Sequence, residues 1–358
     1  MVTRIPLNRG LSYDDVLLTP NKTAVKSLSN VNTSIELDGL KLSAPVISAA
    51  MDTVTEKEFA AEIAQLGGLG VLHRFMSAQE QADQIQEIKQ IESRDTNSSV
   101  DKKGNLIVGA AIGLYDEKRA EKLTTAGVDA LVIDIAHGHH EKLLEKLEYY
   151  STEYPETVII AGNIATAEAA KELEEAGADA VKVGIGPGSA CTTREMTGVG
   201  VPQFTAVKNC AEAVEVPVIA DGGIRKPGDL AKAVMAGASA GMIGGMFAGT
   251  EEAPGKLVTE NGDKYKEFRG MSSREAAEKR AEKEGRELKL SEKVSEGDSD
   301  KVEFKGSLES VMAQLKGGLA SSISYCGADN LQDAREKATF MEITSSTQYR
   351  NGSHMKGI

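Results

Sequence analysis

Helical stretches that end at a glycine and lead directly into apolar strands recur along this chain. Residues 126–134, 176–184 and 236–244 share this form, each opening with Ala-Gly and continuing into an apolar run. The glycine stands where a helix typically ends and the backbone becomes left-handed. Strands that are apolar along their whole length are buried on both faces. The repeats therefore predict a parallel sheet covered by helices.

Eight apolar segments are candidates for the strands of this sheet. An open dinucleotide-binding sheet would carry Gly-x-Gly-x-x-Gly after its first strand, and this chain lacks that pattern there. We therefore predict an α/β fold, a single (β/α)8 TIM barrel over residues 1–358. The predicted strands are 46–49, 69–72, 107–111, 130–133, 158–161, 180–183, 218–220 and 241–243, and the predicted helices are 56–66, 78–92, 117–126, 141–150, 167–176, 206–213 and 227–236.

Two segments interrupt the alternation of strands and helices. Residues 93–104 are polar and rich in turn-forming residues, which predicts a short surface loop. Residues 274–305 are dense in Glu, Lys and Arg and poor in apolar residues. Charge runs usually form a solvated surface, but a long excursion after the last strand of a barrel lies at its catalytic end. We expect a mobile flap over residues 272–305.

The composition excludes several classes of function. Lys and Arg total 41 against 54 for Asp and Glu, giving a formal charge of −13, which disfavours general binding to nucleic acid or to an anionic membrane. No apolar run approaches the ~20 residues of a membrane helix, and no signal-peptide pattern opens the chain. The three cysteines are too few for a disulfide framework. We expect a cytoplasmic protein without nucleic-acid or membrane partners.

The strongest candidate for chemistry is residues 183–194, Val-Gly-Ile-Gly-Pro-Gly-Ser-Ala-Cys-Thr-Thr-Arg. The glycines and the proline keep the backbone out of regular structure and let it pass close to a ligand. Cys191 ends this turn, where exposed backbone N–H groups favour the thiolate. A lone cysteine is more often a small buried hydrophobe. Because the neighbours here are polar and flexible, we interpret Cys191 as a nucleophile.

Glycine pairs and carboxylates follow several of the other predicted strands, where barrel enzymes carry their active sites. Residues 222–223 and 244–245 are glycine pairs whose N–H groups can bind phosphate, and Ser189 can add a hydroxyl. Asp221 can accept the two hydroxyls of a ribose, and Asp134 those of a second nucleotide. A helix N-cap is an equally good interpretation of either aspartate.

Together these segments resemble the IMP dehydrogenase/GMP reductase family. The resemblance covers nearly the whole chain, and the cysteine loop with the following Thr-Gly-Val-Gly-Val-Pro-Gln is its most specific part. It implies a purine-nucleotide barrel that is usually a homotetramer. Many relatives carry a tandem regulatory module between the second and third barrel units, for which residues 93–104 are too short. The matching segments are 11–18, 48–54, 161–163, 184–203, 221–225, 270–271 and 325–328.

The resemblance also implies a role for individual residues. Cys191 would attack C2 of the purine and form a thioimidate, while Thr193 and Glu296 would shuttle a proton. The phosphate would bind to Ser189, Gly223, Gly244 and Gly245, the ribose to Asp221, and the base near Met51, Met271 and Ser272, with Ser48 and Ser273 completing the substrate site.

A nicotinamide cofactor, NADPH or NAD, would by the same resemblance stack beside the base near Asp134, Asn163 and Gly184. Members of the dehydrogenase type bind potassium through backbone carbonyls of the cysteine loop, which here would be those of Gly184, Gly186 and Cys191. The sequence alone does not distinguish the two cofactors.

Two reactions are open to this family, and the flap separates them. Family members of the dehydrogenase type convert IMP, NAD and water to XMP and NADH. They use an Arg-Tyr pair on the flap to activate the water. This chain has no tyrosine between Tyr265 and Tyr325, and its Gly-Met-Ser-Ser at 270–273 resembles the reductase pattern. Residues 134–139 and 250–255 resemble dehydrogenase loops instead. We favour GMP reductase, which converts GMP and NADPH to IMP and ammonia, over IMP dehydrogenase.

A catalytically silent nucleotide-binding regulator is an interpretation from another class. Cys191, Thr193, Asp221 and Glu296 occur together in this chain, and a silent relative would have little reason to keep the nucleophile. The sequence therefore favours an enzyme.

Overall fold

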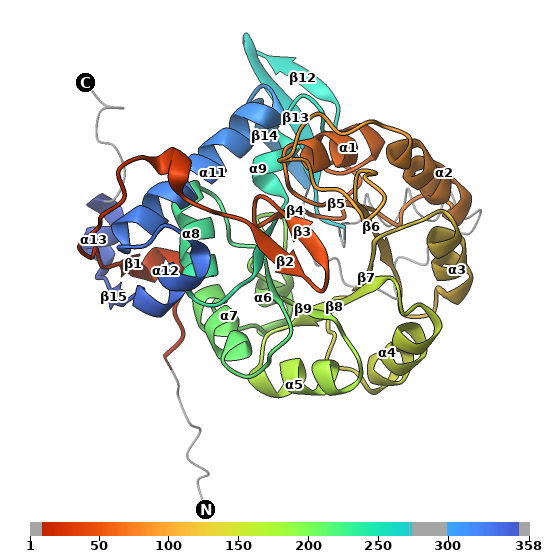
Figure 1. The fold of residues 1–358 in the computed structure, drawn as a ribbon, viewed down its shortest axis with the longest axis horizontal. Coiled ribbons are helices and arrows are strands. Elements are labelled where there is room, and N and C mark those ends of the chain that lie inside the picture. The colour runs from red at the N-terminus through yellow and green to blue at the C-terminus, as the bar shows by residue number, and fades with distance from the viewer. Residues whose placement is uncertain (1–8, 272, 274–298, 351–358) are drawn as a thin grey trace, which may run out of the picture.

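The computed structural model describes residues 9–271, 273 and 299–350 (Figure 1). A ring of parallel strands lies inside a ring of helices. The strands are β4 (Val46–Ser48), β5 (Gly70–Leu72), β6 (Val108–Ile112), β7 (Ala130–Asp134), β8 (Val158–Ile164), β9 (Ala180–Val183), β10 (Val218–Asp221) and β11 (Ala240–Ile243). The helices after them are α1 (Lys57–Gln65), α2 (Ala78–Lys89), α3 (Glu117–Thr125), α4 (Glu141–Glu153), α5 (Ala167–Glu175), α6 (Thr193–Thr197), α7 (Gln203–Ala211), α8 (Pro227–Met235) and α9 (Gly245–Ala248).

The sheet closes on itself. Its strands follow the order β4-β11-β10-β9-β8-β7-β6-β5, with every neighbouring pair parallel. A parallel bridge between Ile47 and Leu69 joins the two ends, and the Ser48 N–H donates to the Leu69 carbonyl at 2.9 Å. The predicted (β/α)8 barrel and its eight strands are therefore confirmed. Closure leaves no unpaired edge in this sheet.

The sequence repeats lie at the junctions where a helix ends and the next strand begins. Gly127, Gly177 and Gly237 each follow a helix with φ between +90° and +112°, as a left-handed helix end requires. Two residues later, Asp129 accepts a hydrogen bond from the Val108 N–H at 2.7 Å. Asp179 does the same for the Ile159 N–H at 2.7 Å. Each aspartate thus ties the start of its own strand to the neighbouring strand.

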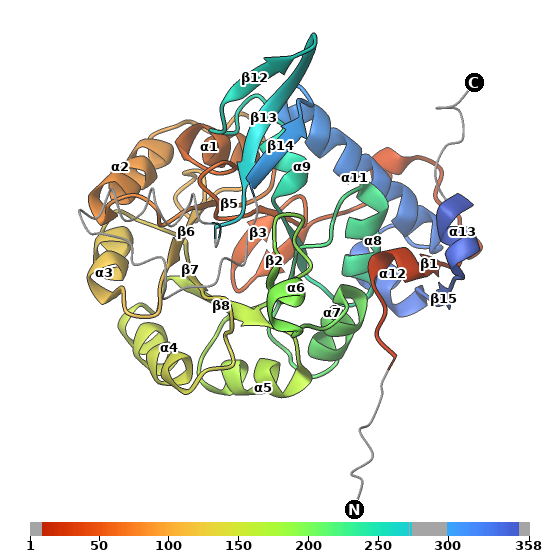
Figure 2. The ribbon, with the colours of Figure 1, turned by 180° about the vertical axis from the view of Figure 1, so that it is seen from behind.

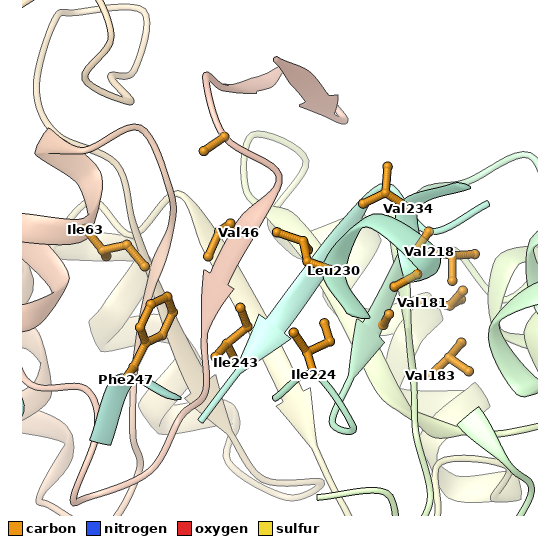
Figure 3. Packing of buried hydrophobic residues seen from close by; sticks show 14 of the residues in the cluster. Val46, Ile63, Val181, Val183, Val218, Ile224, Leu230, Val234, Ile243 and Phe247 are labelled. Atoms are coloured by element: carbon orange, nitrogen blue, oxygen red, sulfur yellow. The ribbon is translucent and has the colours of Figure 1, made fainter. Parts of the chain in front are cut away.

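The barrel strands are buried on both faces, which explains their continuous apolar sequence. Alternate residues divide between two core clusters: Val46 packs outward with the helices, and Ile47 packs inside the barrel. Figure 3 shows the outer layer, where Val46 and Ile243 of neighbouring strands lie near Leu230 of α8. The core is almost entirely aliphatic, as the low aromatic content requires.

Short antiparallel elements cover the two ends of the barrel. The hairpin β2 (Ile35–Leu37) and β3 (Leu40–Leu42) packs Leu37 and Leu42 onto the inner core, closing the end where the strands begin. At the other side, β12 (Leu257–Glu260), β13 (Asp263–Arg269) and β14 (Ser299–Glu303) form a three-stranded sheet that projects from the barrel (Figure 2).

The remaining elements lie beside α8. They include a long helix, which packs against α8, and a small two-stranded sheet that joins both ends of the described chain. They are η1 (Tyr13–Asp15), β1 (Val16–Leu18), η2 (Leu28–Asn30), α11 (Leu308–Tyr325), α12 (Leu331–Lys337), β15 (Phe340–Glu342) and α13 (Ser345–Arg350).

Several predicted boundaries differ from the structure. The helix predicted at 206–213 is α7, which starts earlier at Gln203, because Pro202 fixes the backbone at its N-cap. Residues 93–104 form the short, turn-rich connection expected of them. Of the predicted flap at 272–305, the structure describes Ser273 and residues 299–305, and the rest lies outside the described residues. None of the helices in the described part of the chain combines the length and apolar character needed to cross a membrane.

A substitution at Gly70 of β5 tests how closely α1 packs against the barrel. A Cβ at Gly70 would lie 2.5 Å from Ala60 Cα and 2.6 Å from its Cβ, so the helix backbone would have to move. We expect Gly70→Ala to lower the free energy of unfolding by about 1–3 kcal/mol in urea denaturation. Gly317→Ala is the matched control, because that helical position is open, and it should raise stability by about 0.5–1 kcal/mol. Equal effects of the two substitutions would contradict the packing.

Candidate active site

A cavity opens at the carboxyl end of the barrel strands, the end expected to carry the catalytic residues. Loops that follow β4, β9, β10 and β11 form most of its wall, and the end of β13 closes one side. Figure 2 shows α6 and β13 on this side of the barrel. The lining residues are Ala49, Met51, Asn163, Gly184, Gly186, Pro187, Gly188, Ser189, Ala190, Cys191, Asp221, Gly222, Gly223, Ile224, Arg225, Met242, Gly244, Gly245, Phe268, Gly270 and Met271.

The cysteine loop is folded tightly against its neighbours, and this explains its glycines. A Cβ at Gly184 would collide with the Asp221 carbonyl, and one at Gly186 would collide with the side chain of Arg194. Arg194 in turn closes the loop by donating to the Ile185 carbonyl at 3.1 Å and to the Val201 carbonyl at 2.5 Å. One guanidinium thus joins the chain before the cysteine to the chain after it.

Cys191 is the exposed member of the three free cysteines. Its thiol donates to Thr193 Oγ1 at 3.2 Å, and its N–H donates to the Gly188 carbonyl at 3.1 Å. Burial raises the pKa of the Cys210 thiol to about 12 and also raises the pKa of Cys326. Of the three thiols, Cys191 is therefore the one placed to react with a molecule in the cavity.

The structure brings most of the predicted site residues together. Cys191 and two glycines of its loop, Gly184 and Gly186, line the cavity. So do eight other predicted site residues: Met51, Asn163, Ser189, Asp221, Gly223, Gly244, Gly245 and Met271. A Cβ at Gly245 would lie 2.8 Å from Ser189 Oγ, so these two predicted phosphate-binding residues are adjacent.

Ser48 and Ser273 do not line the cavity. Ser48 is fully buried, and its hydroxyl accepts hydrogen bonds from Thr55 Oγ1 at 2.8 Å and from the Val71 N–H at 3.2 Å. This position joins β4 to β5 rather than facing a ligand. Ser273 is also buried, and its N–H donates to the Gly270 carbonyl. Ser272 and Glu296 lie outside the described residues.

Lys182 is a member of the site that the sequence did not reveal. Its buried ammonium group donates to Asp134 Oδ1 at 2.8 Å, to Asp221 Oδ2 at 2.8 Å and to Asn163 Oδ1. The Asn163 amide then donates to Asp221 Oδ2 at 2.8 Å and to the Gly184 carbonyl at 2.7 Å. The four side chains come from the consecutive strands β7, β8, β9 and β10.

Charge pairing, rather than burial, decides the ionisation of this cluster. Burial by itself lowers the pKa of Lys182, but the carboxylates of Asp134 and Asp221 outweigh it and leave that pKa raised. Burial likewise opposes the ionised form of Asp134, and Lys182 outweighs it, so the pKa of Asp134 is lowered. Both groups are therefore charged near neutral pH.

A second missed feature is the buried ion pair between Asp52 and Arg269. The Arg269 Nε donates to Asp52 Oδ1 at 3.0 Å and to Oδ2 at 3.1 Å, and both side chains are largely buried. The pair joins the loop after β4 to the end of β13. Its neighbours in sequence, Met51 and Met271, both line the cavity. The ion pair thus holds two apolar walls of the cavity in register.

Comparison with known proteins shows the family of this chain. The sequence profile described as IMP dehydrogenase / GMP reductase domain matches residues 10–354. The chain therefore belongs to the IMP dehydrogenase/GMP reductase family, whose members are NAD(P)-dependent oxidoreductases.

Named relatives carry both activities. Inosine-5′-monophosphate dehydrogenase of Methanocaldococcus jannaschii is 37% identical, over 98% of this chain and 96% of its own. GMP reductase of Leishmania donovani is 34% identical, over 97% of each chain. The crystal structure of a cysteine-to-alanine variant of GMP reductase from Trypanosoma brucei, in complex with guanosine 5′-monophosphate, superposes with a TM-score of 0.92. That chain is 32% identical, and the match covers 97% of this chain and 98% of that one.

Selective thiol labelling follows from the exposure of Cys191. With iodoacetamide at pH 8, we expect Cys191 to be alkylated at least about tenfold faster than Cys210 or Cys326, because a high pKa and burial suppress the other thiolates. Peptide mass spectrometry after a time course measures the three rates. Faster labelling of Cys210 would contradict the assignment.

Removal of Arg269 should leave Asp52 as an unpaired buried charge. We expect Arg269→Met to lower the free energy of unfolding by about 3 kcal/mol in urea denaturation. Lys301→Met provides the control, because Lys301 pairs with Glu260 on the same small sheet but both side chains are exposed, and no measurable change is expected. An Arg269→Met protein as stable as the wild type would show that the pair does not hold this wall.

Proposed function

We propose that this protein is a GMP reductase, which converts GMP and NADPH to IMP, ammonia and NADP. The observation that carries the direction of the reaction is the absence of tyrosine between Tyr265 and Tyr325. Hydrolysis of a thioimidate requires a group that activates water, and the Arg-Tyr pair that performs this step in dehydrogenases is missing. A reductase requires only proton transfer to the departing ammonia.

The cavity supports binding of a purine nucleotide. The phosphate would accept hydrogen bonds at Ser189, Gly223, Gly244 and Gly245, where glycines leave the backbone open to an anion. The ribose hydroxyls would bind Asp221, whose second carboxylate oxygen is already fixed by Lys182 and Asn163. The base would lie between Met51 and Met271, whose soft thioethers suit a flat aromatic ring.

The reaction would begin at Cys191. Its thiolate adds to C2 of GMP, the bond from C2 to the amino nitrogen breaks, and ammonia leaves with a proton, giving a thioimidate. Thr193 lies within hydrogen-bonding distance of the sulfur and would pass that proton together with Glu296. NADPH, when bound at Asp134, Asn163 and Gly184, would supply the hydride that C2 receives. The C2–S bond then breaks, IMP is released and the thiolate is restored.

The cofactor would bind beside the nucleotide at Asp134, Asn163 and Gly184. Asp134 is partly exposed and ionised, so it fits the hydroxyls of a second ribose. Potassium would require the carbonyls of Gly184, Gly186 and Cys191. The first of these already accepts from Asn163, and Arg194 closes the loop. The side chains of Asn163 and Arg194 thus hold the loop in place.

Spectrophotometry in both directions tests the proposal. With purified protein, GMP and NADPH should give a loss of absorbance at the reduced-nicotinamide band, whereas IMP with NAD and potassium should give no gain. A gain only with IMP would establish IMP dehydrogenase, which the dehydrogenase-like residues 134–139 favour. No change in either cuvette would support a silent nucleotide-binding regulator.

Replacement of the nucleophile separates binding from turnover. We expect Cys191→Ala to lower kcat at least about a thousandfold, because no thioimidate can form. The dissociation constant for GMP, measured by calorimetry, should change less than about threefold, since the phosphate and ribose contacts remain. Cys210→Ala is the matched control and should keep full turnover. Residual turnover above one hundredth in Cys191→Ala would refute the covalent mechanism.

We also propose that the protein is a homotetramer, as the family implies. Light scattering coupled to size-exclusion chromatography should give about four times the chain mass of 37.9 kDa. A monomeric mass would overturn this proposal without affecting the reaction.

A further inference from the structure

A single buried ammonium group joins the two predicted ribose sites. Lys182 has three N–H donors, and all three are used, by Asp134, Asn163 and Asp221. Its side chain is 3% exposed, against 33% for Asp134 and 21% for Asp221. The lysine is thus sealed beneath two carboxylates that reach the surface. It cannot itself contact a ligand while it keeps these partners.

The two carboxylates divide their oxygens in the same way. Asp134 offers Oδ1 to Lys182, and Asp221 offers Oδ2. Among the described residues, no hydrogen bond occupies the other oxygen of either side chain. Each aspartate therefore has one oxygen fixed from below and one available to a hydroxyl group, and the same cation fixes both. Carboxylates held in this way are pre-organised acceptors.

The backbone is adapted to this lysine. Lys182 pairs with Gly162 of β8 and Ile219 of β10 in the sheet. A Cβ at Gly162 would lie 2.6 Å from the Lys182 carbonyl oxygen and 2.7 Å from its Cβ. Only glycine leaves room there for the lysine stem inside an otherwise apolar strand.

We propose that Lys182 is a shared positioning residue, which orients Asp221 for the substrate ribose and Asp134 for the cofactor ribose at the same time. The inference rests on the nucleotide sites of the proposed function. Without the ammonium group, two carboxylates and an amide would face one another with no cation between them. The carboxylates would then turn apart or take up a proton, and both would become poor acceptors for a ribose hydroxyl.

Ligands with and without the hydroxyls isolate this role. The dissociation constants of GMP and of 2′,3′-dideoxy-GMP are measured by calorimetry for the wild type, Lys182→Met and Lys182→Arg. The wild type should prefer GMP by about tenfold or more, since only GMP can bind Asp221 through its hydroxyls. In Lys182→Met this preference should fall below about threefold. Lys182→Arg keeps the charge and should restore most of it. A purely structural role would weaken both ligands equally and leave the ratio unchanged.

The cofactor is measured on the same proteins. Quenching or enhancement of nicotinamide fluorescence should give an NADPH dissociation constant about tenfold higher in Lys182→Met than in the wild type. Lys89→Met is the matched control, because Lys89 also bonds two aspartates, Asp101 and Asp129, at the opposite end of the barrel. It should leave the GMP preference and the NADPH affinity unchanged.

The outcomes distinguish the inference from its foundation. A folded Lys182→Met protein that keeps the wild-type preference for GMP, or loses affinity for only one of the two ligands, overturns the shared role. A wild type that does not distinguish GMP from its dideoxy analogue overturns the ribose assignment of Asp221 itself, and the inference with it. If Lys182→Met does not fold by circular dichroism, Lys182→Gln, which is neutral but still polar, serves in the same titrations with the same criteria.

Discussion

Closure of the eight-stranded sheet is the constraint from which the other features follow. Each barrel strand is paired on both sides and covered on both faces, so polar groups are costly along the strands and collect where the strands end. Lys182 is the exception that this rule explains: a charge inside a strand persists because Asp134 and Asp221 surround it. The same closure brings the ends of β7, β8, β9 and β10 side by side, which makes that arrangement possible.

The barrel was predictable because its signal is local and repeated. Each of the three Ala-Gly junctions encodes a helix end followed by a strand, and the eight strands could be located from their short apolar runs. The hairpin β2–β3 and the sheet β12–β14 were not predicted. Their strands are short and antiparallel, and some of their pairing is remote: Tyr265 lies opposite Glu303, across the charged segment that separates β13 from β14.

The site was predicted as far as single segments could reveal it. Cys191, Asp221 and the glycine pairs stand at or just after the ends of strands, where the local composition is itself informative. Lys182 stands in the apolar run Ala-Val-Lys-Val, which predicts a strand but gives no sign of its partners, because these lie 19 to 48 residues away. Asp52 and Arg269 are 217 residues apart. Ser48 follows a strand as a ligand-binding residue would, yet local packing turns its hydroxyl to Thr55.

The hairpin at the far end of the barrel has a consequence for turnover. Leu37 and Leu42 close the end of the barrel where the strands begin. Aliphatic side chains fill the interior behind them, so no ligand passes through the barrel. Among the described residues, the cavity that reaches Cys191 opens at the carboxyl end of the strands, so ligands of this site enter and leave from that end. When ligands enter and leave through the same entrance, a product that dissociates slowly blocks the binding of the next substrate. The order of product release then limits how soon the next cycle begins. Any change in access to this cavity therefore changes the rate of the whole cycle.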